Sequence, residues 1–381
     1  MSNTDKSALV PKRRFPEFRG AGGWNVKPFQ KLFTIGSGRD YKHLSGGSIP
    51  VYGSGGYMLS VNDFLHDGES VCIGRKGTIN NPMLLTGKFW TVDTLFYTHS
   101  FRDCLPKFVY AIFQNIDWLK HNEAGGVPSL SKTIIEKIQT AIPGIAEQQK
   151  IADCLSSLDE LIAAQTCKVD ALKTHKKGLM QQLFPREGET QPRMRFPEFR
   201  DAAEWLPKTL GDACKMQAGK FVSAADIHAQ SASGFFPCFG GNGLRGFTVT
   251  QTHNGTYPLI GRQGALCGNV KLATGKFHAT EHALVVTPNK GVEAVWLYYL
   301  LDLLNLNRFA TGQAQPGLSV DVLEKVPAAV PEDEKEQQAI SSCLTSLDTV
   351  IAAAIQELET LKTHKKGLMQ QLFPSAEAVE A

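Results

Sequence analysis

Hydrophobic residues recur with alternating spacings of four and three along two stretches of the chain. In the first stretch the repeating positions are Ile151, Leu155, Leu158, Ile162, Gln165, Val169, Leu172, Lys176, Leu179 and Leu183. In the second they are Ile340, Leu344, Leu347, Ile351, Ala354, Leu358, Leu361, Lys365, Leu368 and Leu372, each 189 positions later. Such spacing keeps a narrow apolar stripe facing a partner helix. The pattern therefore predicts two long helices that pack on each other.

The connection between these helices predicts their relative direction. A helix over 151–183 is about 48 Å long at about 1.5 Å per residue. The polar linker 186–192 can span at most about 23 Å, so the second globular segment must begin near the end of the first helix. We therefore expect the helices to run antiparallel, with one globular head at each end and a pseudo-twofold axis between them.

The rest of the chain is also duplicated. The segment FPEFR at 15–19 recurs at 196–200, and GRKG at 74–77 recurs as GRQG at 261–264. The segment LKTHKKGLMQQLFP at 172–185 recurs letter for letter at 361–374. A period of 181 to 189 residues is too long for a solenoid. The chain is therefore expected to contain two copies of one module.

Each module begins with a Gly-rich segment in which short runs of β-branched and aromatic residues alternate with turn signals. This composition predicts strands, with helix near 108–119 and 295–304. The predicted fold class is α+β, with two strand-rich α/β domains separated by a long antiparallel two-helix coiled coil. The expected segments are a first head at 1–146, a coil helix at 147–185, a linker and second head at 186–335, a coil helix at 336–374 and a flexible tail at 375–381.

The net charge of the whole chain does not indicate a binding partner. Its 381 residues hold 40 Lys and Arg against 37 Asp and Glu, a net charge of +3. The first head carries 17 basic and 11 acidic residues over 1–146, whereas 191–335 carries 14 and 13. Any basic binding surface must therefore be local.

The cysteines and the apolar segments favour a soluble protein of a reducing compartment. Eight cysteines are scattered, without a CxxC pair or a Cys/His cluster at metal-ligand spacing. No signal-like apolar run follows the N-terminal charges, and no stretch approaches the roughly 18 apolar residues of a membrane span. We expect a cytoplasmic location, no metal site and no membrane partner.

The two GRxG segments are the strongest candidates for binding. They place Arg75 and Lys76 in one copy, and Arg262 and Gln263 in the other, between glycines. Glycine lets the backbone approach a ligand closely, and Arg can donate a forked pair of hydrogen bonds to guanine or phosphate. The change from Lys76 to Gln263 would alter the favoured base edge. The alternative is a solvated β-turn with an incidental charge.

Two further Gly-rich turns could bind phosphate through backbone amides. They lie at 52–57, with Ser54 and Tyr57, and at 239–243, with Asn242, and neither fits a P-loop. A plain hairpin turn is the alternative. Nearby cations that could contact phosphate, or simply be solvated, are Arg39, Lys42, Lys220 and Arg245.

Two short segments and one basic cluster remain open to two interpretations each. Ser131 in 126–131 and Ser319 in 315–319 could cap helices or bind DNA. The cluster repeated on the coil could dock two copies of one partner, or it could be a solvated face kept by shared ancestry. Its lysines are Lys173, Lys176, Lys177, Lys362, Lys365 and Lys366. No catalytic Ser/His/Asp or paired-carboxylate set is recognisable, so no catalytic residue is predicted.

With these features the chain resembles the specificity subunit of type I restriction-modification enzymes over nearly its full length. The resemblance is carried by the two-module plan, the FPEFR entries, the GRKG and GRQG turns and the KKGLMQQLFP ends. It is also carried by the coil starts EQQKIADCLSSLDELI at 147–162 and EQQAISSCLTSLDTVI at 336–351.

The resemblance implies a non-catalytic subunit with two target-recognition domains. Each would read one half of a bipartite, asymmetric site in double-stranded DNA, while the coil sets the gap and docks two methyltransferase subunits. S-adenosylmethionine, ATP and Mg²⁺ would belong to the methyltransferase and restriction subunits, with no cofactor in this chain. The chain agrees with this division of labour, since it lacks an Asp-Pro-Pro-Tyr type methylation motif and a GxxxxGK[ST] motif. The alternatives are a scaffold or antirestriction decoy that does not read DNA, and a self-sufficient nuclease or methyltransferase.

Overall fold

The structure is a computed structural model that describes residues 9–264, 266–312, 316–375 and 379. The chain divides into two compact units, and each unit takes one head together with part of both long helices. Unit 1 comprises 1–166 and 356–381, and unit 2 comprises 167–355. Each unit is therefore assembled from parts of both sequence modules.

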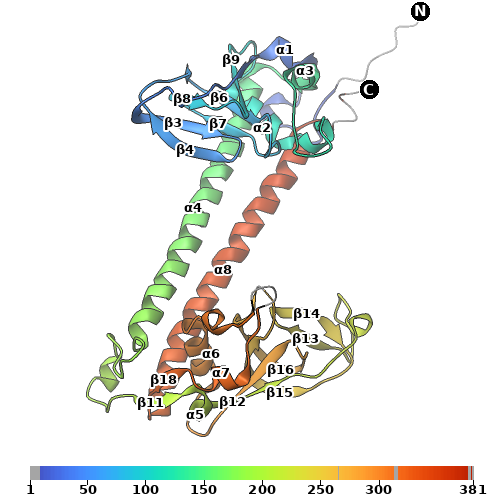
Figure 1. The fold of residues 1–381 in the computed structure, drawn as a ribbon. Coiled ribbons are helices and arrows are strands. Elements are labelled where there is room, and N and C mark those ends of the chain that lie inside the picture. Colours follow the sequence, from blue (N-terminus) through green and yellow to red (C-terminus); the bar gives the residue numbers. More distant parts are fainter. Residues whose placement is uncertain (1–8, 265, 313–315, 376–378, 380–381) are drawn as a thin grey trace, which may run out of the picture. The chain divides into compact units, whose positions relative to one another are not determined.

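Unit 1 contains the first head, whose elements are labelled in Figure 1. Its strands are β1 (Asn25–Pro28), β2 (Thr34–Ser37), β3 (Gly46–Gly53), β4 (Gly56–Val61), β5 (His66–Asp67), β6 (Ser70–Gly74), β7 (Met83–Leu85), β8 (Lys88–Thr91), β9 (Leu95–His99) and β10 (Gln139–Ile142). Its helices are α1 (Phe29–Leu32), α2 (Pro106–Asn115) and α3 (Lys132–Lys137), with 3-10 turns at Pro16–Phe18 and Trp118–His121.

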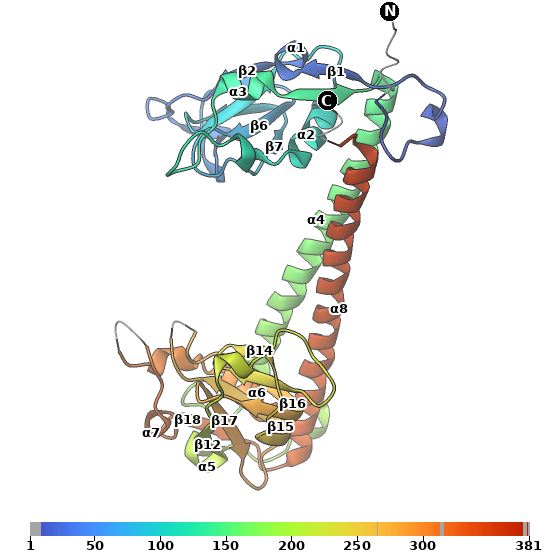
Figure 2. The same ribbon diagram turned by 90° about the vertical axis from the view of Figure 1, so that its right-hand side faces the viewer.

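The strands of the first head form two four-stranded sheets and one separate ladder. The sheet orders are β2-β9-β6-β7 and β4-β3-β8-β5. The pair β3–β8 is parallel, and the other ladders of this head are antiparallel across the described residues. Strand β1 pairs with β10, and β10 leads directly into the long helix α4 (Figure 2).

Unit 2 contains the second head, which joins its strands differently. Its strands are β11 (Leu206–Thr209), β12 (Cys214–Ala218), β13 (Phe236–Gly240), β14 (Gly243–Thr248), β15 (His253–Gly261), β16 (Val270–Ala279), β17 (Ala283–Pro288) and β18 (Pro327–Val330). Its helices are α5 (Leu210–Ala213), α6 (Ala294–Leu303) and α7 (Val320–Leu323), with 3-10 turns at Pro197–Phe199, Ala224–Asp226 and Leu306–Phe309. One six-stranded sheet, β12-β17-β15-β16-β13-β14, replaces the two smaller sheets of the first head, while β11 pairs with β18 as β1 does with β10.

The long helices are α4 (Ile145–Leu183) and α8 (Glu334–Leu372), each of 39 residues. Both begin and end two residues earlier than the sequence-based segments. In unit 1, Lys365 Nζ lies 2.6 Å from Asp159 Oδ1, and in unit 2 Lys176 Nζ lies 2.6 Å from Asp348 Oδ1. Early residues of one helix thus face late residues of the other within each unit. This confirms the predicted antiparallel helix pair and, with the two strand-rich heads, the predicted α+β fold class.

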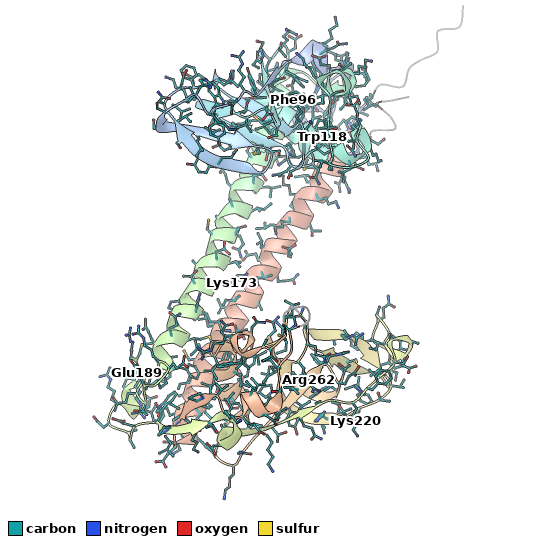
Figure 3. All side chains as sticks on the ribbon, in the orientation of Figure 1. Phe96, Trp118, Lys173, Glu189, Lys220 and Arg262 are labelled. Atoms are coloured by element: carbon teal, nitrogen blue, oxygen red, sulfur yellow. The ribbon has the colours of Figure 1, made fainter. Side chains whose placement is uncertain are left out.

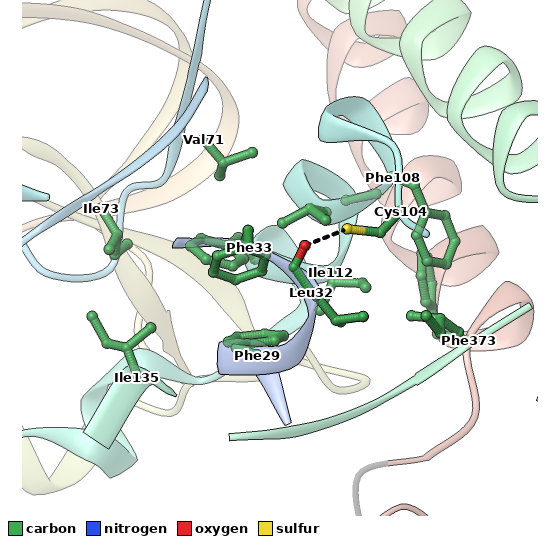
Figure 4. Close-up of a cluster of buried hydrophobic side chains, with 14 of the residues drawn as sticks. Phe29, Leu32, Phe33, Val71, Ile73, Cys104, Phe108, Ile112, Ile135 and Phe373 are labelled. Atoms are coloured by element: carbon green, nitrogen blue, oxygen red, sulfur yellow. Dashed lines mark hydrogen bonds between the residues drawn. The ribbon is translucent and has the colours of Figure 1, made fainter. Parts of the chain in front are cut away.

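The identical ends of the two helices complete the cores of the heads. In unit 1, Phe373 packs beside Phe108 and Cys104, and the Cys104 thiol donates to Leu32 O at 3.2 Å (Figure 4). In unit 2, Phe184 stacks on Trp296 at 5.9 Å between ring centroids. Burying a large apolar side chain stabilises a fold by about 1.5–3 kcal/mol. The repeated Met, Leu and Phe of these ends are therefore explained by core packing within each unit.

The coil starts are fastened to their heads by an equally repeated set of hydrogen bonds. The buried Glu147 carboxylate accepts from Arg14 at 2.6 and 2.7 Å and from Trp24 Nε1 at 3.4 Å. The next residue, Gln148, accepts from Leu105 N and donates to the carbonyls of Asp103 and Pro143. In unit 2 the corresponding groups are Glu336, Arg195, Trp205 and Gln337.

Helix α8 also contains an 18-residue window of mean hydropathy 1.3 that, by length and composition alone, could cross a membrane. The sequence-based expectation of no such stretch was therefore wrong by this measure. Within unit 2, however, α8 packs against α4 and pairs Asp348 with Lys176. A charged pair on the packed face is unfavourable in a lipid bilayer. We therefore interpret α8 as a coil helix.

Candidate nucleic-acid interface

The GRKG turn of unit 1 is held on both sides by backbone hydrogen bonds. Arg75 N donates to Thr94 O at 2.7 Å, in the segment before β9. On the other side, Leu130 N donates to Arg75 O and Gly77 N donates to Pro128 O, both at 2.9 Å. These hydrogen bonds fix the backbone of the turn, so Arg75 and Lys76 project from a rigid segment.

Both glycines of this turn are required by the backbone. A Cβ on Gly74 would lie 2.0 Å from Thr78 O, and Gly77 has a φ of +83°. L-amino acids other than glycine avoid that left-handed region. The glycines flanking Arg75 and Lys76 therefore shape the turn.

The GRQG turn of unit 2 repeats this frame bond for bond. Arg262 N donates to His282 O, Leu318 N donates to Arg262 O, and Gly264 N donates to Pro316 O, each at 2.9 Å. The φ of Gly264 is +85°, and a Cβ on Gly261 would lie 2.1 Å from Gly241 O. Two heads with different sheets therefore present the same turn with different central side chains.

A hollow of about 330 Å³ opens beside the turn of unit 1. Its lining residues are Ser37, Arg75, Lys76, Phe96, Glu123, Ser129, Leu130, Ser131 and Lys132. Both predicted cations are exposed, and the Arg75 guanidinium lies 5.9 Å from the centroid of the Phe96 ring. Ser37, Ser129 and Lys132 were missed from the sequence, because they reach the turn only through strand pairing and backbone bonds between distant segments.

Positive charge extends from this hollow to the neighbouring strand β9. Burial lowers the pKa of the His99 ring. The positive charges of His66, Lys132 and Arg102 lower it further. Lys132 and Arg102 thus place positive charge near the end of β9, next to the hollow that Lys132 lines.

In unit 2 the two central side chains lie in different surroundings. Arg262 is half-buried and Gln263 is exposed (Figure 3 labels Arg262). The Gln263 Oε1 atom lies 3.1 Å from His282 Nδ1, and His282 Nε2 lies 3.2 Å from Glu281 Oε1. The side chains of Glu281, His282 and Gln263 therefore form a series of polar contacts that ends at the GRQG turn.

The Gly-rich turns predicted separately lie against the GRxG turns. In unit 1 a Cβ on Gly77 would lie 3.5 Å from Ser54 Oγ, so Ser54 borders the GRKG turn. In unit 2 Gly241 packs on the His282 carbonyl and on Gly261. Its neighbour Asn242 accepts from Asn269 at 2.9 Å. The structure thus brings together two motifs that are about 20 positions apart in sequence.

The remaining predicted DNA ligands lie on other parts of the heads. Arg39 and Lys42 are exposed after β2, and Tyr57 is exposed on β4 with its hydroxyl 3.1 Å from Ser60 Oγ. Lys220 is exposed after β12, and Arg245 is exposed on β14. Of these, none lines the described hollow beside Arg75.

The serines that were open to two interpretations differ from each other. Ser131 Oγ accepts from Ile134 N at 3.2 Å and therefore caps α3, while also lining the hollow beside Arg75. Ser319 stands at the N-cap of α7 without a side-chain cap bond among the described contacts. Gln315, the first residue of that predicted segment, lies outside the described residues.

The coil lysines fall into two groups. Lys176 and Lys365 face the partner helix, and only 16% and 11% of their side-chain surfaces are exposed. Their repetition is explained by pairing within the units, so they give little support to docking. The other four, Lys173, Lys177, Lys362 and Lys366, are exposed, and Figure 3 labels Lys173 on the coil.

Unit 2 also has a larger hollow, of about 630 Å³, between the end of α4, the following linker and α6. It is lined by apolar groups such as Leu300 and Leu304 and by the cations Arg186, Arg193 and Arg308. It contains none of the predicted site residues. Across the described part of the chain, no cluster of three or more His, Cys, Asp or Glu side chains could hold a metal ion.

Comparison with known proteins places this geometry in a family. Residues 22–174 and again 202–363 match the family model described as the type I restriction modification DNA specificity domain. The EcoprrI specificity subunit of Escherichia coli is 33% identical over 346 residues, which cover 87% of this chain and 83% of that protein. The MjaVIII specificity subunit of Methanocaldococcus jannaschii is 24% identical over 349 residues, covering 83% and 79%.

Solved structures share the fold. The crystal structure of the S subunit of a type I restriction-modification system from M. genitalium superposes with a TM-score of 0.70 at 15% identity. The superposition covers 96% of this chain and 100% of the M. genitalium chain. Two matches to the domain model, both including a GRxG turn and most of a coil helix, span most of the sequence. The chain therefore belongs to the family of type I restriction-modification specificity subunits.

Proposed function

We propose that this chain reads a bipartite DNA sequence for a type I restriction-modification enzyme and performs no catalysis itself. The head of unit 1 would read one half-site through Arg75 and Lys76, and the head of unit 2 the other through Arg262 and Gln263. Arg and Lys favour guanine O6 and N7, whereas Gln pairs with adenine. The two half-sites should therefore differ in sequence.

One observation carries this proposal. Both heads hold the GRxG backbone by the same three hydrogen bonds, yet the residue after Arg changes from Lys76 to Gln263. A site that reads sequence needs a constant backbone and a variable side chain. The backbone positions the side chain against DNA, and the side chain selects the base. An incidental solvated turn would need neither the paired glycines nor the second supporting segment.

The proposed partners are two methyltransferase subunits and the restriction subunits that act with them. Exposed apolar residues at equivalent positions of the two coil helices support two matching docking sites: Leu161 is 54% exposed in unit 1, and Val350 is 48% exposed in unit 2. Only 28% of the apolar window in α8 is buried. A helix of a partner could cover such surface.

The proposal assigns the chemistry to those partners. S-adenosylmethionine would be bound by the methyltransferase subunits, and ATP and Mg²⁺ by the restriction subunits. The substrate is chromosomal DNA, so we propose a cytoplasmic location. The coil would set the length of the unread gap between the half-sites.

Site-specific methylation by the assembled complex tests the proposal. The complex of this chain with its methyltransferase should methylate one bipartite sequence, read by sequencing of modified adenines. Arg75→Glu and Arg262→Glu should each abolish methylation at that sequence, because a carboxylate repels phosphate and guanine acceptors. Lys31→Glu and Lys325→Glu, which change the same charge at exposed positions away from the turns, should leave it intact.

Two results would contradict this function. A wild-type complex that methylates without sequence preference would remove the reading role. Arg75→Glu and Arg262→Glu complexes with wild-type methylation would show that the turns do not contact DNA. A chain that sequesters the methyltransferase yet supports no site-specific methylation would instead be the decoy considered from the sequence.

A further inference from the structure

The side chain of Gln263 is held by a second residue that the first head lacks. His282 Nδ1 lies 3.1 Å from Gln263 Oε1, and His282 Nε2 lies 3.2 Å from the Glu281 carboxylate. The backbone joins the same residues, since Arg262 N donates to His282 O. In the first head the position equivalent to His282 is Thr94, which receives the matching bond from Arg75 N.

The hydrogen-bonding capacities of these groups allow two arrangements. A carboxylate only accepts, so the ring nitrogen facing Glu281 must carry a proton. In a neutral ring His282 Nδ1 then has a lone pair and can only accept. It pairs with Gln263 if the amide NH₂ faces it, which turns Oε1 outward.

A protonated ring imposes the opposite arrangement. Nδ1 then carries a proton and donates to Gln263 Oε1, which leaves the amide NH₂ facing outward. In the structure the Oε1 side of the amide lies toward His282 Nδ1. The two states differ by a half-turn of one exposed amide, a motion that exposed side chains complete rapidly.

We propose that His282, held by Glu281, is a positioning residue that decides which face of the Gln263 amide the second head presents to DNA. The inference rests on the proposed function. An outward oxygen accepts from the exocyclic amines of adenine or cytosine, whereas an outward NH₂ donates to purine N7, guanine O6 or thymine O4 and finds no acceptor on cytosine. His282 thereby determines the base preference at one position of one half-site without touching DNA.

Charged groups around the ring bear on its protonation. Glu281 lies on the same segment, and Arg262 lies on the facing turn. Burial raises the pKa of the nearby Cys238 thiol on β13, where Arg245 of β14 lowers it and Glu281 raises it. The hairpin residue that packs on the His282 carbonyl is Gly241, which brings no charge.

The experiment uses the assembled methyltransferase complex and a library of DNA sites randomised one position at a time. Methylation of each site is counted by sequencing at pH 8 and at pH 5.5. In the wild type, one position of the second half-site should favour adenine or cytosine by about fivefold or more at pH 8. At pH 5.5 cytosine should become the least favoured base there, because it offers the outward NH₂ no acceptor in the major groove.

His282→Ala should reduce the preference at that position to less than about twofold at both pH values. Its side chain is 46% exposed, so the fold should tolerate the change. Gln263→Glu presents carboxylate oxygens in every state and should keep the adenine or cytosine preference at both pH values, with weaker overall binding. The first half-site is the internal control for the His282→Ala variant, since Thr94 occupies the equivalent position of the first head.

The outcomes separate this inference from the proposed function. Unchanged preference and unchanged pH response in His282→Ala would overturn the inference while leaving DNA reading intact. An equal fall in methylation of every library member would also overturn it, because a merely structural role lowers binding without changing discrimination. Absence of sequence preference in the wild type at both half-sites would contradict the proposed function itself.

Discussion

At the scale of single residues, the repeated motifs are explained mostly by contacts within each unit. Glu147 lies in the first turn of α4. Its side chain is 3% exposed, and it accepts hydrogen bonds from Arg14 and Trp24. Its carboxylate raises the pKa of Arg14, and the same shift is found for Arg195 beside Glu336. A buried charge without its partner is strongly unfavourable. These side chains therefore attach each head to a coil start.

Removing this carboxylate should loosen one unit and spare the other. Glu147→Ala leaves the guanidinium of Arg14, which is 9% exposed, without its carboxylate, and should cost about 3–5 kcal/mol of stability in unit 1. Hydrogen exchange followed by mass spectrometry should show faster exchange at β1 and β10, with β11 and β18 unchanged.

The duplicated chain supplies the matched control for that variant. Glu336→Ala should give the reverse pattern, with fast exchange at β11 and β18 only. Equal protection of all four strands in both variants would show that the buried ion pairs contribute nothing to holding the heads.

At the scale of elements, the two coil helices are placed in register by charged pairs in their apolar seam. Lys365 donates to Asp159 at 2.6 Å and to Gln114 at 2.9 Å, and thus also links the coil to α2. In unit 2 the equivalent Lys176 pairs with Asp348, which also accepts from Tyr299 at 2.7 Å. A polar contact at a seam position favours one register, because any slip leaves the charge unpaired.

A double-mutant cycle measures this register contact. Asp159→Ala should destabilise unit 1 by about 1–3 kcal/mol, between the values for exposed and buried pairs, because Asp159 is 41% exposed and Lys365 is 11% exposed. Lys365→Met, which keeps the packing volume, should cost less.

The coupling between the two changes is the decisive quantity. The double variant should be more stable than the sum of the single effects predicts, as measured by urea unfolding. Strict additivity would mean that the two side chains do not interact.

At the scale of the whole molecule, the duplication makes each unit depend on both modules. The end of α8 completes the core of the first head, and the end of α4 completes the core of the second. Asp159 and Lys176 are 17 positions apart on α4, as are Asp348 and Lys365 on α8. Both charged pairs can therefore form at the same time only if the segment of α4 from Asp159 to Lys176 is as long as the segment of α8 from Asp348 to Lys365.

Matched insertions should lengthen the proposed gap without changing the half-sites. Seven residues that continue the heptad pattern, added before Thr174 in α4 and before Thr363 in α8, keep both charged pairs and add about 10 Å of helix, or about three base pairs of DNA. Sequencing of methylated adenines would report the new gap.

An insertion in one helix alone is the control for that prediction. It leaves the helices unequal between the charged pairs, so one pair must break and the unfolding midpoint should fall. A gap unchanged by the matched insertion would exclude the coil as the element that sets it.

The local sequence pattern was sufficient to predict the features that depend on residues close together in the chain. The seam spacing predicted the two long helices, and the short linker between the modules predicted their direction. The repeated GRxG letters selected turns whose glycines the backbone requires. Strand pairing was different, since it depends on packing between distant segments. No pattern along the chain indicated that the first head would form two four-stranded sheets and the second head one six-stranded sheet.

The same distinction applies to the candidate site. The sequence by itself determined the duplication, the helix pair and the positions of the GRxG turns, because periodicity and glycine geometry are local properties. Only the tertiary structure decided that Lys176 and Lys365 serve the coil, that Ser54 lies beside Gly77, and that His282 reaches Gln263. Those contacts join residues from different strands and helices, and hydrogen bonds and ion pairs act only at distances that folding creates.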